Sequence, residues 1–599
     1  MKALLKRIVR SAALISHDKM RILFLLSGLI IVLLITLGSV SASRSCSQSH
    51  YDQSFAKFDQ SYYENGDSTD LISDTIRQIR SVHSERSEPG EKERNQDEDG
   101  PSRYGSSEGI NLETSDMKAC KQSDVRAFKQ ALEKDGFTVQ EGGFEYINLI
   151  DLYFSNPVFM PTAAGNNPTT KYIGYSVPPA PSHVNPVRAN YSKVLGSSSS
   201  DSNIWNLGPD EAVVFVGRTP PKCRYFSFDS AMQAGTYEDK FLWMWPSIGD
   251  TLNNLVIKTE GTPNGRHGNP FNQTTVIIHT ADRGIDHRIR AAAQSAGYPN
   301  SIINTMVFPS SMLHMGINTG SDIFSTYIRP ALYEDQQAGD KYLQNTPAVL
   351  FRITPNKSAE PDPYKVPKQR VRGSGTTEFE LTDDLEELRM AILNEYSGWH
   401  AKELPTSQWF PPGNDAFQKG INVYGPDNDA CYLWTATQTL SAQMPWIDPV
   451  IENFNHHYYP FMVDSEVKLN NSNEFLIVYG VNHVATRKAT YSNFVPYAAE
   501  GWYGVGAVTD VDFNGTAQAY LPDNPNAKYL YVYKVARYCD ESHCFVVPSY
   551  LNKTEEKYGI PFDDPLLIGW RLYLEKGTKT GPSYNEIVYD RAIKFDPKS

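Results

Sequence analysis

The longest uninterrupted apolar stretch of the chain lies near its start, at residues 22–40, and contains no charged side chain. As a helix it spans roughly 28 Å, close to the thickness of a bilayer's hydrocarbon core. Lysine and arginine are concentrated in residues 1–21, and only Arg44 follows closely. This asymmetry predicts a transmembrane signal-anchor over residues 22–42, with a basic cytosolic tail and the rest of the chain extracytosolic. Small residues around Ala42 leave an alternative, a cleaved signal peptide and a secreted protein.

After this segment the pattern divides the chain into four parts. Residues 43–115 are poor in aliphatic side chains and rich in Ser, Asp, Glu and Arg, which predicts a disordered stalk. Apolar periodicity resumes over residues 116–355, which we interpret as an α/β domain. Residues 356–378 are polar and interrupted by proline and glycine, as is typical of a linker. Residues 379–599 are predicted to form a mixed, β-rich domain.

Within the first domain, the period of the apolar positions switches between two and about 3.6 residues. The most specific pattern is a strand, a helix ended by Gly297 and a second strand, an order that favours a parallel crossover. The sequence therefore predicts a partly parallel sheet here. The expected elements are helices at 123–135 and 286–296 and strands at 137–141, 145–150, 211–217, 275–282 and 301–308.

In the second domain one helix precedes a series of strands. Leu385, Leu388 and Ile392 mark one side of this helix, which Thr382 is expected to cap and Gly398 to end. Strands are predicted at 475–479, 529–533, 566–574 and 585–589. The fold class is thus α/β plus β-rich, following a membrane helix and a disordered stalk.

Composition argues against nucleic-acid binding but does not identify an activity. A net charge of −13 and the lack of a basic cluster beyond the N-terminal tail argue against nucleic-acid binding. The membrane, through residues 22–42, is the expected partner, and no motif identifies another partner or a cofactor. The chain contains no nucleophile elbow, phosphate loop, His-Glu-x-x-His helix or dinucleotide fingerprint.

Cysteines and glycosylation sequons fit an extracytosolic compartment. Cys539 and Cys544 are spaced for a local disulfide, with zinc held by these two and His543 as the alternative. Six sequons occur, although chance alone predicts about five in such a composition. The candidate glycosylation sites are Asn190, Asn272, Asn356, Asn470, Asn514 and Asn552.

Polar residues follow several apolar runs directly, and ligands of open α/β sheets bind at the carboxyl ends of strands. If these strands share a sheet, His279, Asp282 and His483 converge as a catalytic group, in which a carboxylate orients a histidine base. Metal binding by the two histidines with Asp282 or Asp286 is the alternative. The expected ligand-binding residues at the same strand ends are Arg218, Arg283 and Asn482.

Two function classes stay open on this basis. The first is a membrane-tethered extracytosolic protein with hydrolase-like activity at the His/Asp site, which predicts that the two imidazoles lie within roughly 10 Å of each other in a pocket. The second is a non-enzymatic surface or secreted binding or structural glycoprotein that uses the long loop at 156–202 and exposed tyrosines.

Overall fold

The computed structural model describes residues 122–155, 162–183, 201–237, 240–243, 246–318, 320–358, 360–408, 427–435, 465–550 and 558–598. All of them belong to a unit that extends from Asn111 to Ser599. The predicted membrane segment at 22–42 and the predicted stalk at 43–115 lie outside the described residues. Within the described ranges, no helix is both long and apolar enough to cross a bilayer.

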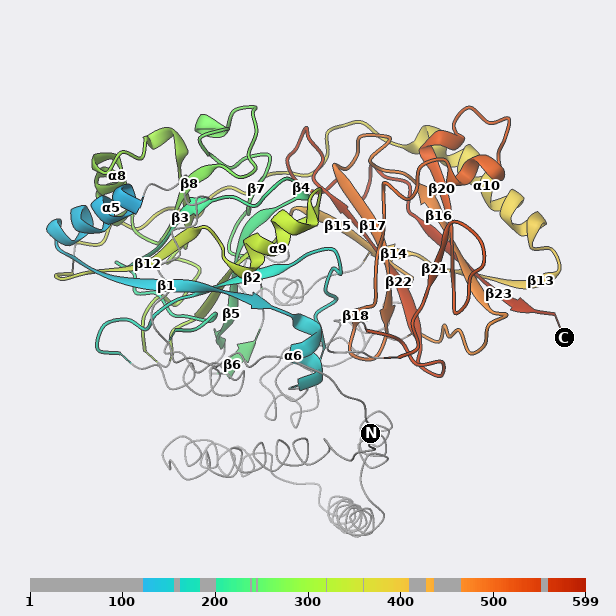
Figure 1. The fold of residues 1–599 in the computed structure, drawn as a ribbon, viewed down its shortest axis with the longest axis horizontal. Helices are drawn as coiled ribbons and strands as arrows, with labels where there is room; N and C mark the ends of the chain where they lie inside the picture. Colours follow the sequence, from blue (N-terminus) through green and yellow to red (C-terminus); the bar gives the residue numbers. More distant parts are fainter. Residues whose placement is uncertain are drawn as a thin grey trace, which may run out of the picture. The chain divides into compact units, whose positions relative to one another are not determined.

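The first half is built around one large sheet (Figure 1). Its strands are β1 (Phe137–Ile147), β2 (Tyr172–Ser176), β3 (Ala212–Arg218), β5 (Ser227–Tyr237), β6 (Lys240–Trp243), β7 (Leu252–Asn253), β8 (Thr274–Thr280), β9 (Ile303–Val307), β10 (Ile323–Ile328) and β12 (Ala348–Pro355). They follow the order β6-β5-β10-β2-β1-β12-β3-β8-β9, and β7 pairs with β5. A separate pair joins β4 (Cys223–Tyr225) to β11 (Ala331–Tyr333).

The predicted strand-helix-strand crossover is confirmed, because β8 and β9 run parallel with a helix between them. The helices of this half are α5 (Gln122–Lys134), α6 (Leu149–Ser155), α8 (Arg283–Ser295) and α9 (Gln336–Gln344). Ile285, Ile289 and Ala293 recur on one side of α8 and are fully buried. They share a core cluster with Phe128 and Leu132 of α5, so α5 and α8 cover the same face of the sheet.

The sequence around β1 folds differently from the prediction. The two strands expected at 137–141 and 145–150 form the single strand β1, and the end of that stretch belongs to α6. Asn148 explains the change, since its side-chain oxygen accepts hydrogen bonds from the amides of Ile150 and Asp151 at 3.1 and 3.2 Å. This contact caps a helix exactly where the apolar run otherwise favours a strand, so the strand prediction for 149–150 is wrong.

The second half is rich in strands, as predicted, and forms two sheets (Figure 1). Its strands are β13 (Trp399–Leu404), β14 (Ser407–Gln408), β15 (Ala430–Trp434), β16 (Phe475–Val481), β17 (Tyr491–Ala498), β18 (Tyr503–Gly504), β19 (Val508–Thr509), β20 (Leu530–Ala536), β21 (Cys544–Val546), β22 (Leu566–Tyr573) and β23 (Arg591–Pro597). The five-stranded sheet has the order β13-β23-β16-β20-β21. The six-stranded sheet has the order β14-β15-β22-β17-β18, and β19 pairs with β17.

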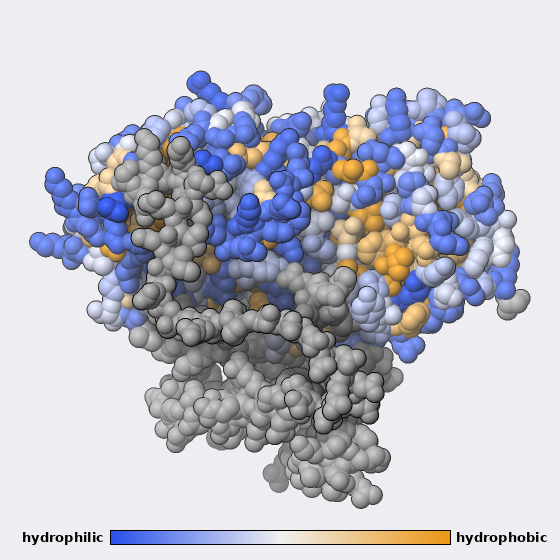
Figure 2. Space-filling view, viewed as in Figure 1, coloured by the Kyte–Doolittle hydropathy of each residue, from blue (hydrophilic) through white to orange (hydrophobic). Residues whose placement is uncertain are grey.

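Alternating side chains of the six-stranded sheet are buried on both of its faces. Leu566, Ile568 and Trp570 of β22 join the core shared with the five-stranded sheet, whereas Leu567 and Tyr573 join a cluster that includes β4 and β11. Helix α10 (Thr382–Glu395) covers the outer face of the five-stranded sheet. On the side shown, hydrophobic residues gather over the strands of the second half (Figure 2).

Two details of the second half differ from the prediction. The strand expected at 585–589 is wrong, because the last strand begins at Arg591 and pairs with β13 and β16. Thr382 is the first residue of α10 and not its cap. Its hydroxyl donates to the carbonyl of Phe379 at 2.8 Å, in the short turn before the helix.

A segment of the first half, residues 162–170, docks on the six-stranded sheet. The amide of Ala163 donates to the carbonyl of Gly501 at 2.8 Å, and that of Gly165 donates to Trp502 at 2.9 Å. Asn166 accepts a hydrogen bond from the amide of Gly504 at 2.9 Å. This part of the long loop predicted for surface binding is therefore bound internally.

Candidate functional site

His279 is completely buried at the end of β8. Its Nδ1 lies 3.0 Å from the carbonyl oxygen of Val213, and its ring packs between Tyr175 and Phe308, with centroids 5.4 and 6.2 Å away. Because a carbonyl only accepts, Nδ1 carries the proton. Burial lowers the pKa of His279 to about 4, so the ring is neutral near pH 7. Nε2 has no hydrogen-bond partner among the described residues.

Asp282 and Arg283 serve the start of α8. One carboxylate oxygen of Asp282 accepts from the amide of Ile285 at 2.9 Å, which makes Asp282 the helix N-cap. The other oxygen accepts from the amide of Asp362 at 2.6 Å. Arg283 is exposed and donates from Nε to the Asp362 carboxylate at 3.0 Å. Both residues thus connect the start of α8 to the segment at Asp362.

Arg218 does not share an edge with His279. β3 and β8 are antiparallel, so Arg218 pairs with Thr274 at the start of β8, while Val213 pairs with His279 near its end. Five residues of strand separate the two positions by about 17 Å. Arg218 donates to the side chain of Asn272 at 3.0 Å. The expectation that strand-end residues gather assumed parallel neighbours, which these strands are not.

His483 lies in the other half of the described chain, just after β16. Its Nδ1 lies 2.9 Å from both carboxylate oxygens of Glu378, and its Nε2 lies 3.0 Å from Asp590. Burial alone lowers the pKa of His483, but the attraction of the two carboxylates and hydrogen bonds to them outweigh burial and raise it to about 10. His483 is therefore a buried cation. Neighbouring Asn482 accepts a hydrogen bond from the amide of Val484 at 3.2 Å.

The two histidines thus lie in different halves of the described chain and have different partners, and no contact of the described residues joins them. No group of His, Cys, Asp and Glu within the described ranges is arranged to hold a metal. The predicted disulfide between Cys539 and Cys544 is confirmed. It engages both sulfurs, so the alternative of a zinc site with His543 is wrong.

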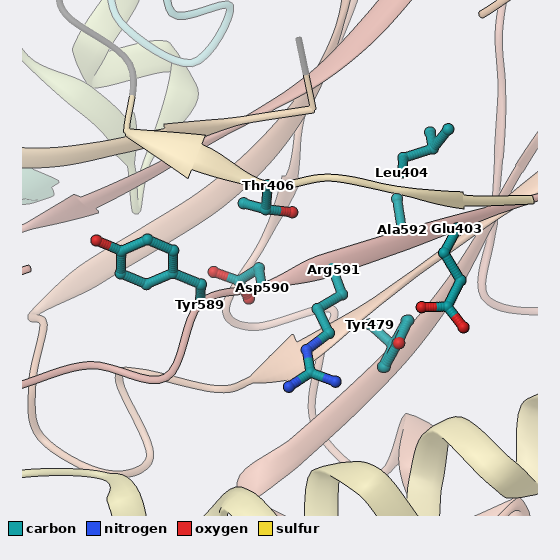
Figure 3. A pocket seen from close by; sticks show the side chains of 8 residues that line it. All are labelled: Glu403, Leu404, Thr406, Tyr479, Tyr589, Asp590, Arg591 and Ala592. Atoms are coloured by element: carbon teal, nitrogen blue, oxygen red, sulfur yellow. The ribbon is translucent and has the colours of Figure 1, made fainter. Parts of the chain in front are cut away.

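A pocket lies where β13 and β16 meet the segment that leads into β23 (Figure 3). Its volume is about 230 Å³, somewhat below the roughly 300–1,000 Å³ that is usual for small-molecule sites, so it has room for a single small ligand. The lining residues are Glu403, Leu404, Thr406, Tyr479, Tyr589, Asp590, Arg591 and Ala592.

Asp590 connects this pocket to the buried His483. The residue is only 1% exposed. One oxygen of its carboxylate contacts His483, and the other accepts from the hydroxyl of Tyr531 at 2.8 Å. Gly480 packs against it, and a Cβ at that position would lie 2.2 Å from the carboxylate. The back wall of the pocket is therefore a fixed acidic group with a cation behind it.

The other charged groups of the pocket are paired. Arg591 donates to Glu386, and Arg389 donates from Nε to Glu403 at 2.9 Å. Burial raises the pKa of Tyr479 to about 12, although Arg591 acts in the opposite direction, so this phenol stays protonated.

Two hydroxyl groups complete the polar lining. The hydroxyl of Tyr589 accepts from the side-chain amide of Gln408 at 3.0 Å. The hydroxyl of Thr406 is shielded from solvent and has no hydrogen-bond partner in the described part of the chain. An unpaired buried hydroxyl costs free energy, about 1–3 kcal/mol, and a bound ligand or water normally satisfies it.

Of the predicted site residues, His483 alone contacts a residue of this pocket. The sequence offers little signal for Asp590, Thr406 or Glu378, because they come from three separate segments. Asp590 directly precedes the last strand. The search for polar residues at the carboxyl ends of strands therefore could not find it, because it lies at an amino end.

Comparisons with known proteins add only distant likenesses. No protein-family model matches the chain, and no curated protein matches it. An uncharacterized protein from Burkholderia cenocepacia is similar in structure with a TM-score of 0.31 and 12% identity, over 79% of this chain and 86% of its own. The VPA0106 protein from Vibrio parahaemolyticus has a TM-score of 0.31 and 8% identity, over 79% of this chain and 98% of its own. At this level, neither match bears on function.

Proposed function

We propose that this protein binds a small, neutral, hydroxyl-rich molecule, such as a sugar unit, in the pocket beside β23. The observation that carries the proposal is the polar lining, in which two carboxylates, a guanidinium and three hydroxyl groups surround one concavity. These groups both donate and accept hydrogen bonds, as a polyhydroxylated ligand requires. The hydroxyl of Thr406 supports the proposal, because it is a lining group that has no hydrogen-bond partner among the described residues.

The charges of the pocket favour a neutral ligand. Glu403 is paired with Arg389, Arg591 with Glu386, and Asp590 with the His483 cation. No lining charge among the described residues is left for an ionic ligand to neutralise. Burying an ionic ligand beside paired charges carries a desolvation cost without a matching gain.

Binding can be tested by saturation-transfer NMR with D-glucose, D-galactose and N-acetylglucosamine as probes. We expect at least one probe to bind, and both Thr406→Val and Tyr589→Phe to weaken its binding about fivefold to tenfold, the effect of losing one hydrogen bond of about 1 kcal/mol. The matched controls are Thr377→Val and Tyr538→Phe, exposed positions outside the pocket lining. If no probe binds, or if the pocket variants bind like the controls, the proposal is wrong.

Hydrolysis in the same pocket is a second proposal, favoured by the presence of two carboxyl groups, Asp590 and Glu403, in its lining. Glycoside hydrolysis requires such a pair, one as acid and one as base or nucleophile. The catalytic group predicted from the sequence, His279, Asp282 and His483, stays a prediction, although each of the three has another partner. A 4-nitrophenyl glycoside assay separates the two proposals. Turnover that Glu403→Gln abolishes while sugar binding persists supports a hydrolase, and binding without turnover supports a binding protein.

We further propose that this unit is extracytosolic and tethered by the segment at 22–42, with secretion after cleavage near Ala42 as the alternative. The disulfide supports this location, because such bonds persist in oxidising compartments. All four sequon asparagines within the described ranges are exposed, as glycosylation requires: Asn272, Asn356, Asn470 and Asn514. Asn190 and Asn552 lie outside the described residues.

Protease treatment of sealed vesicles tests this topology. We expect a protected fragment containing residues 122–598, and we expect peptide-N-glycosidase to reduce its mass. Digestion of this fragment from the cytosolic side contradicts the topology. Recovery of the intact fragment in the soluble lumenal fraction, with a new N-terminus near Ala42, supports the secreted form.

A further inference from the structure

A buried ionic junction connects the two halves of the described chain. Arg329 follows β10, and one of its terminal nitrogens lies 2.9 Å from the carboxylate of Asp229 in β5. The same nitrogen lies 2.7 Å from the carboxylate of Asp427, which precedes β15. One guanidinium therefore joins a strand of the large sheet to the six-stranded sheet.

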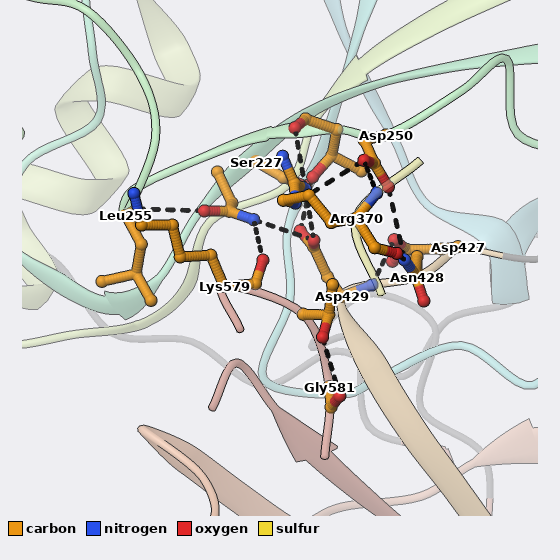
Figure 4. Close-up of polar contacts among 12 residues, drawn as sticks. Ser227, Asp250, Leu255, Arg370, Asp427, Asn428, Asp429, Lys579 and Gly581 are labelled. Carbon is orange, nitrogen blue, oxygen red and sulfur yellow. Dashed lines mark hydrogen bonds and ion pairs between the residues drawn. The ribbon is translucent and has the colours of Figure 1, made fainter. Parts of the chain in front are cut away.

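A second carboxylate, that of Asp429, joins the same elements (Figure 4). Three neutral donors of the first half reach it: the hydroxyls of Tyr225 and Thr251 at 2.9 and 2.6 Å, and the amide of Asn253 at 2.8 Å. Arg370 lies 3.4 Å away and also contacts Asp250. The side chain of Asp429 is completely buried.

The formal charges of this junction do not balance. Its members are Asp229, Asp250, Asp427, Asp429, Arg329 and Arg370, so four carboxylates face two guanidinium groups and leave a charge of −2. At least 78% of every one of these side chains is buried. Four tyrosines that face it stay neutral, because burial raises their pKa: Tyr225, Tyr327, Tyr432 and Tyr573. The nearest further charge on that side is buried Arg571, which lies over the ring of Tyr432 and has no contact with the four carboxylates. Uncompensated negative charge is costly in such surroundings.

We propose that this junction is tightened by acid, because uptake of a proton by one or two of its carboxyl groups removes the excess charge while its hydrogen bonds remain. Asp229 and Asp429 are the groups that take up the protons. Protonated Asp229 still accepts from Arg329 and offers its own hydrogen to Ser247, whose hydroxyl lies 3.3 Å away. When Asp429 is protonated, the hydroxyl of Tyr225 or Thr251 can turn so that its oxygen accepts the new hydrogen. The junction thus acts as a stabilising device for acidic surroundings.

The direction of the pH dependence follows from the two carboxyl groups. Burial, with the neighbouring carboxylates, raises the pKa of Asp229 to about 7 and that of Asp429 to about 6, although Arg329 and Arg370 act in the opposite direction. Their usual pKa is 3.8. Between roughly pH 4 and pH 7 the folded protein therefore holds protons that the unfolded chain releases. Lowering the pH through this window stabilises the fold, and raising it through the same window removes the gain.

Urea denaturation of the whole protein at about pH 8 and pH 5.5 tests the proposal. Asp229→Asn replaces the carboxyl group by a neutral isostere, and its new amide can donate to Ser247. We expect this variant to reach a higher urea midpoint than the wild type at pH 8. We also expect the gain in midpoint on acidification to be clearly smaller than that of the wild type, since one of the two carboxyl groups that take up protons is removed. Exposed Asp523→Asn is the matched control and should keep the wild-type gain.

The comparison between variants isolates the junction, because all other titrating groups are shared. Asp429→Asn provides an independent second variant with the same expectation. The infrared band of a protonated carboxyl group at about pH 6 is a readout that does not depend on stability, and it should weaken in both variants. A gain on acidification in both Asn variants equal to that of Asp523→Asn overturns the proposal. An unchanged carboxyl band in both variants overturns it as well.

Discussion

Replacing His483 by glutamine removes a buried cation between two carboxylates. In the wild type, both ring nitrogens are bonded, at 2.9 Å to Glu378 and at 3.0 Å to Asp590. Glutamine is neutral and can donate to only one of these carboxylates at a time. Breaking a buried ionic arrangement by removing one partner costs about 3–5 kcal/mol of stability. We therefore expect a loss of this size at pH 7 for His483→Gln.

The pH dependence gives an independent magnitude. The pKa of His483 is about 10 in the folded protein, against a usual value of 6.5. The raised pKa means that the folded protein keeps a proton that the unfolded chain loses, so the contribution is complete below pH 6.5 and declines as the pH rises to 10. The difference corresponds to about 5 kcal/mol for a fully buried group, as an order of magnitude.

Urea denaturation at intervals from about pH 6 to pH 10 is the assay. We expect the stability of the wild type to fall by about 5 kcal/mol more than that of His483→Gln across this range. Exposed His400→Gln on β13 is the control and should follow the wild type. If the His483→Gln and wild-type curves run parallel, or their stabilities at pH 7 are equal, His483 is not a buried cation and the reasoning is refuted.

Other positions give further expectations. Because the pKa of His279 is lowered to about 4, acidification from pH 6.5 to pH 4 should stabilise His279→Phe by about 3 kcal/mol more than the wild type, as measured by urea midpoints. Equal acid sensitivity of the two proteins contradicts this. Replacing Cys539 and Cys544 by serine should cost about 2 kcal/mol under oxidising conditions, the chain-entropy value for so short a loop, and nothing under reducing conditions. Gly480→Ala should cost about 1–3 kcal/mol and weaken sugar binding, since the added methyl displaces Asp590; a stable variant with wild-type binding disproves the contact.

Elements with long, regular apolar spacing could be predicted from the sequence. The helix predicted at 286–296 has buried residues at intervals of three and four. It corresponds to α8, which begins three residues earlier, at Arg283. The strand at 566–574 was evident because both faces of β22 are buried, which makes the run almost wholly apolar. The prediction of a strand at 585–589 is wrong. Ile587 and Val588 are buried, as in a strand, but they lie in an irregular segment that pairs with no strand.

The pocket could not be predicted, because its residues meet only through the order of the strands. Asp590 and Glu403 are 187 positions apart in sequence and come together because β13 pairs with β23. His483 was selected as a polar residue after a strand, and its contacts with Glu378 and Asp590 carry no local signature. Arg218 shows the opposite error, since its distance from His279 depends on strand direction, which spacing does not reveal.

The docking of residues 162–170 has a consequence for how this chain can be divided or recombined. A gene fragment that begins near residue 379 encodes every strand of the two smaller sheets but lacks the amides of Ala163 and Gly165 that bind Gly501 and Trp502. Such a fragment also lacks β4 and β11, which cover one face of the six-stranded sheet, so it leaves both backbone acceptors and apolar side chains of that sheet uncovered. A fusion that transfers the β-rich half to another protein must therefore include the nine residues 162–170 as well.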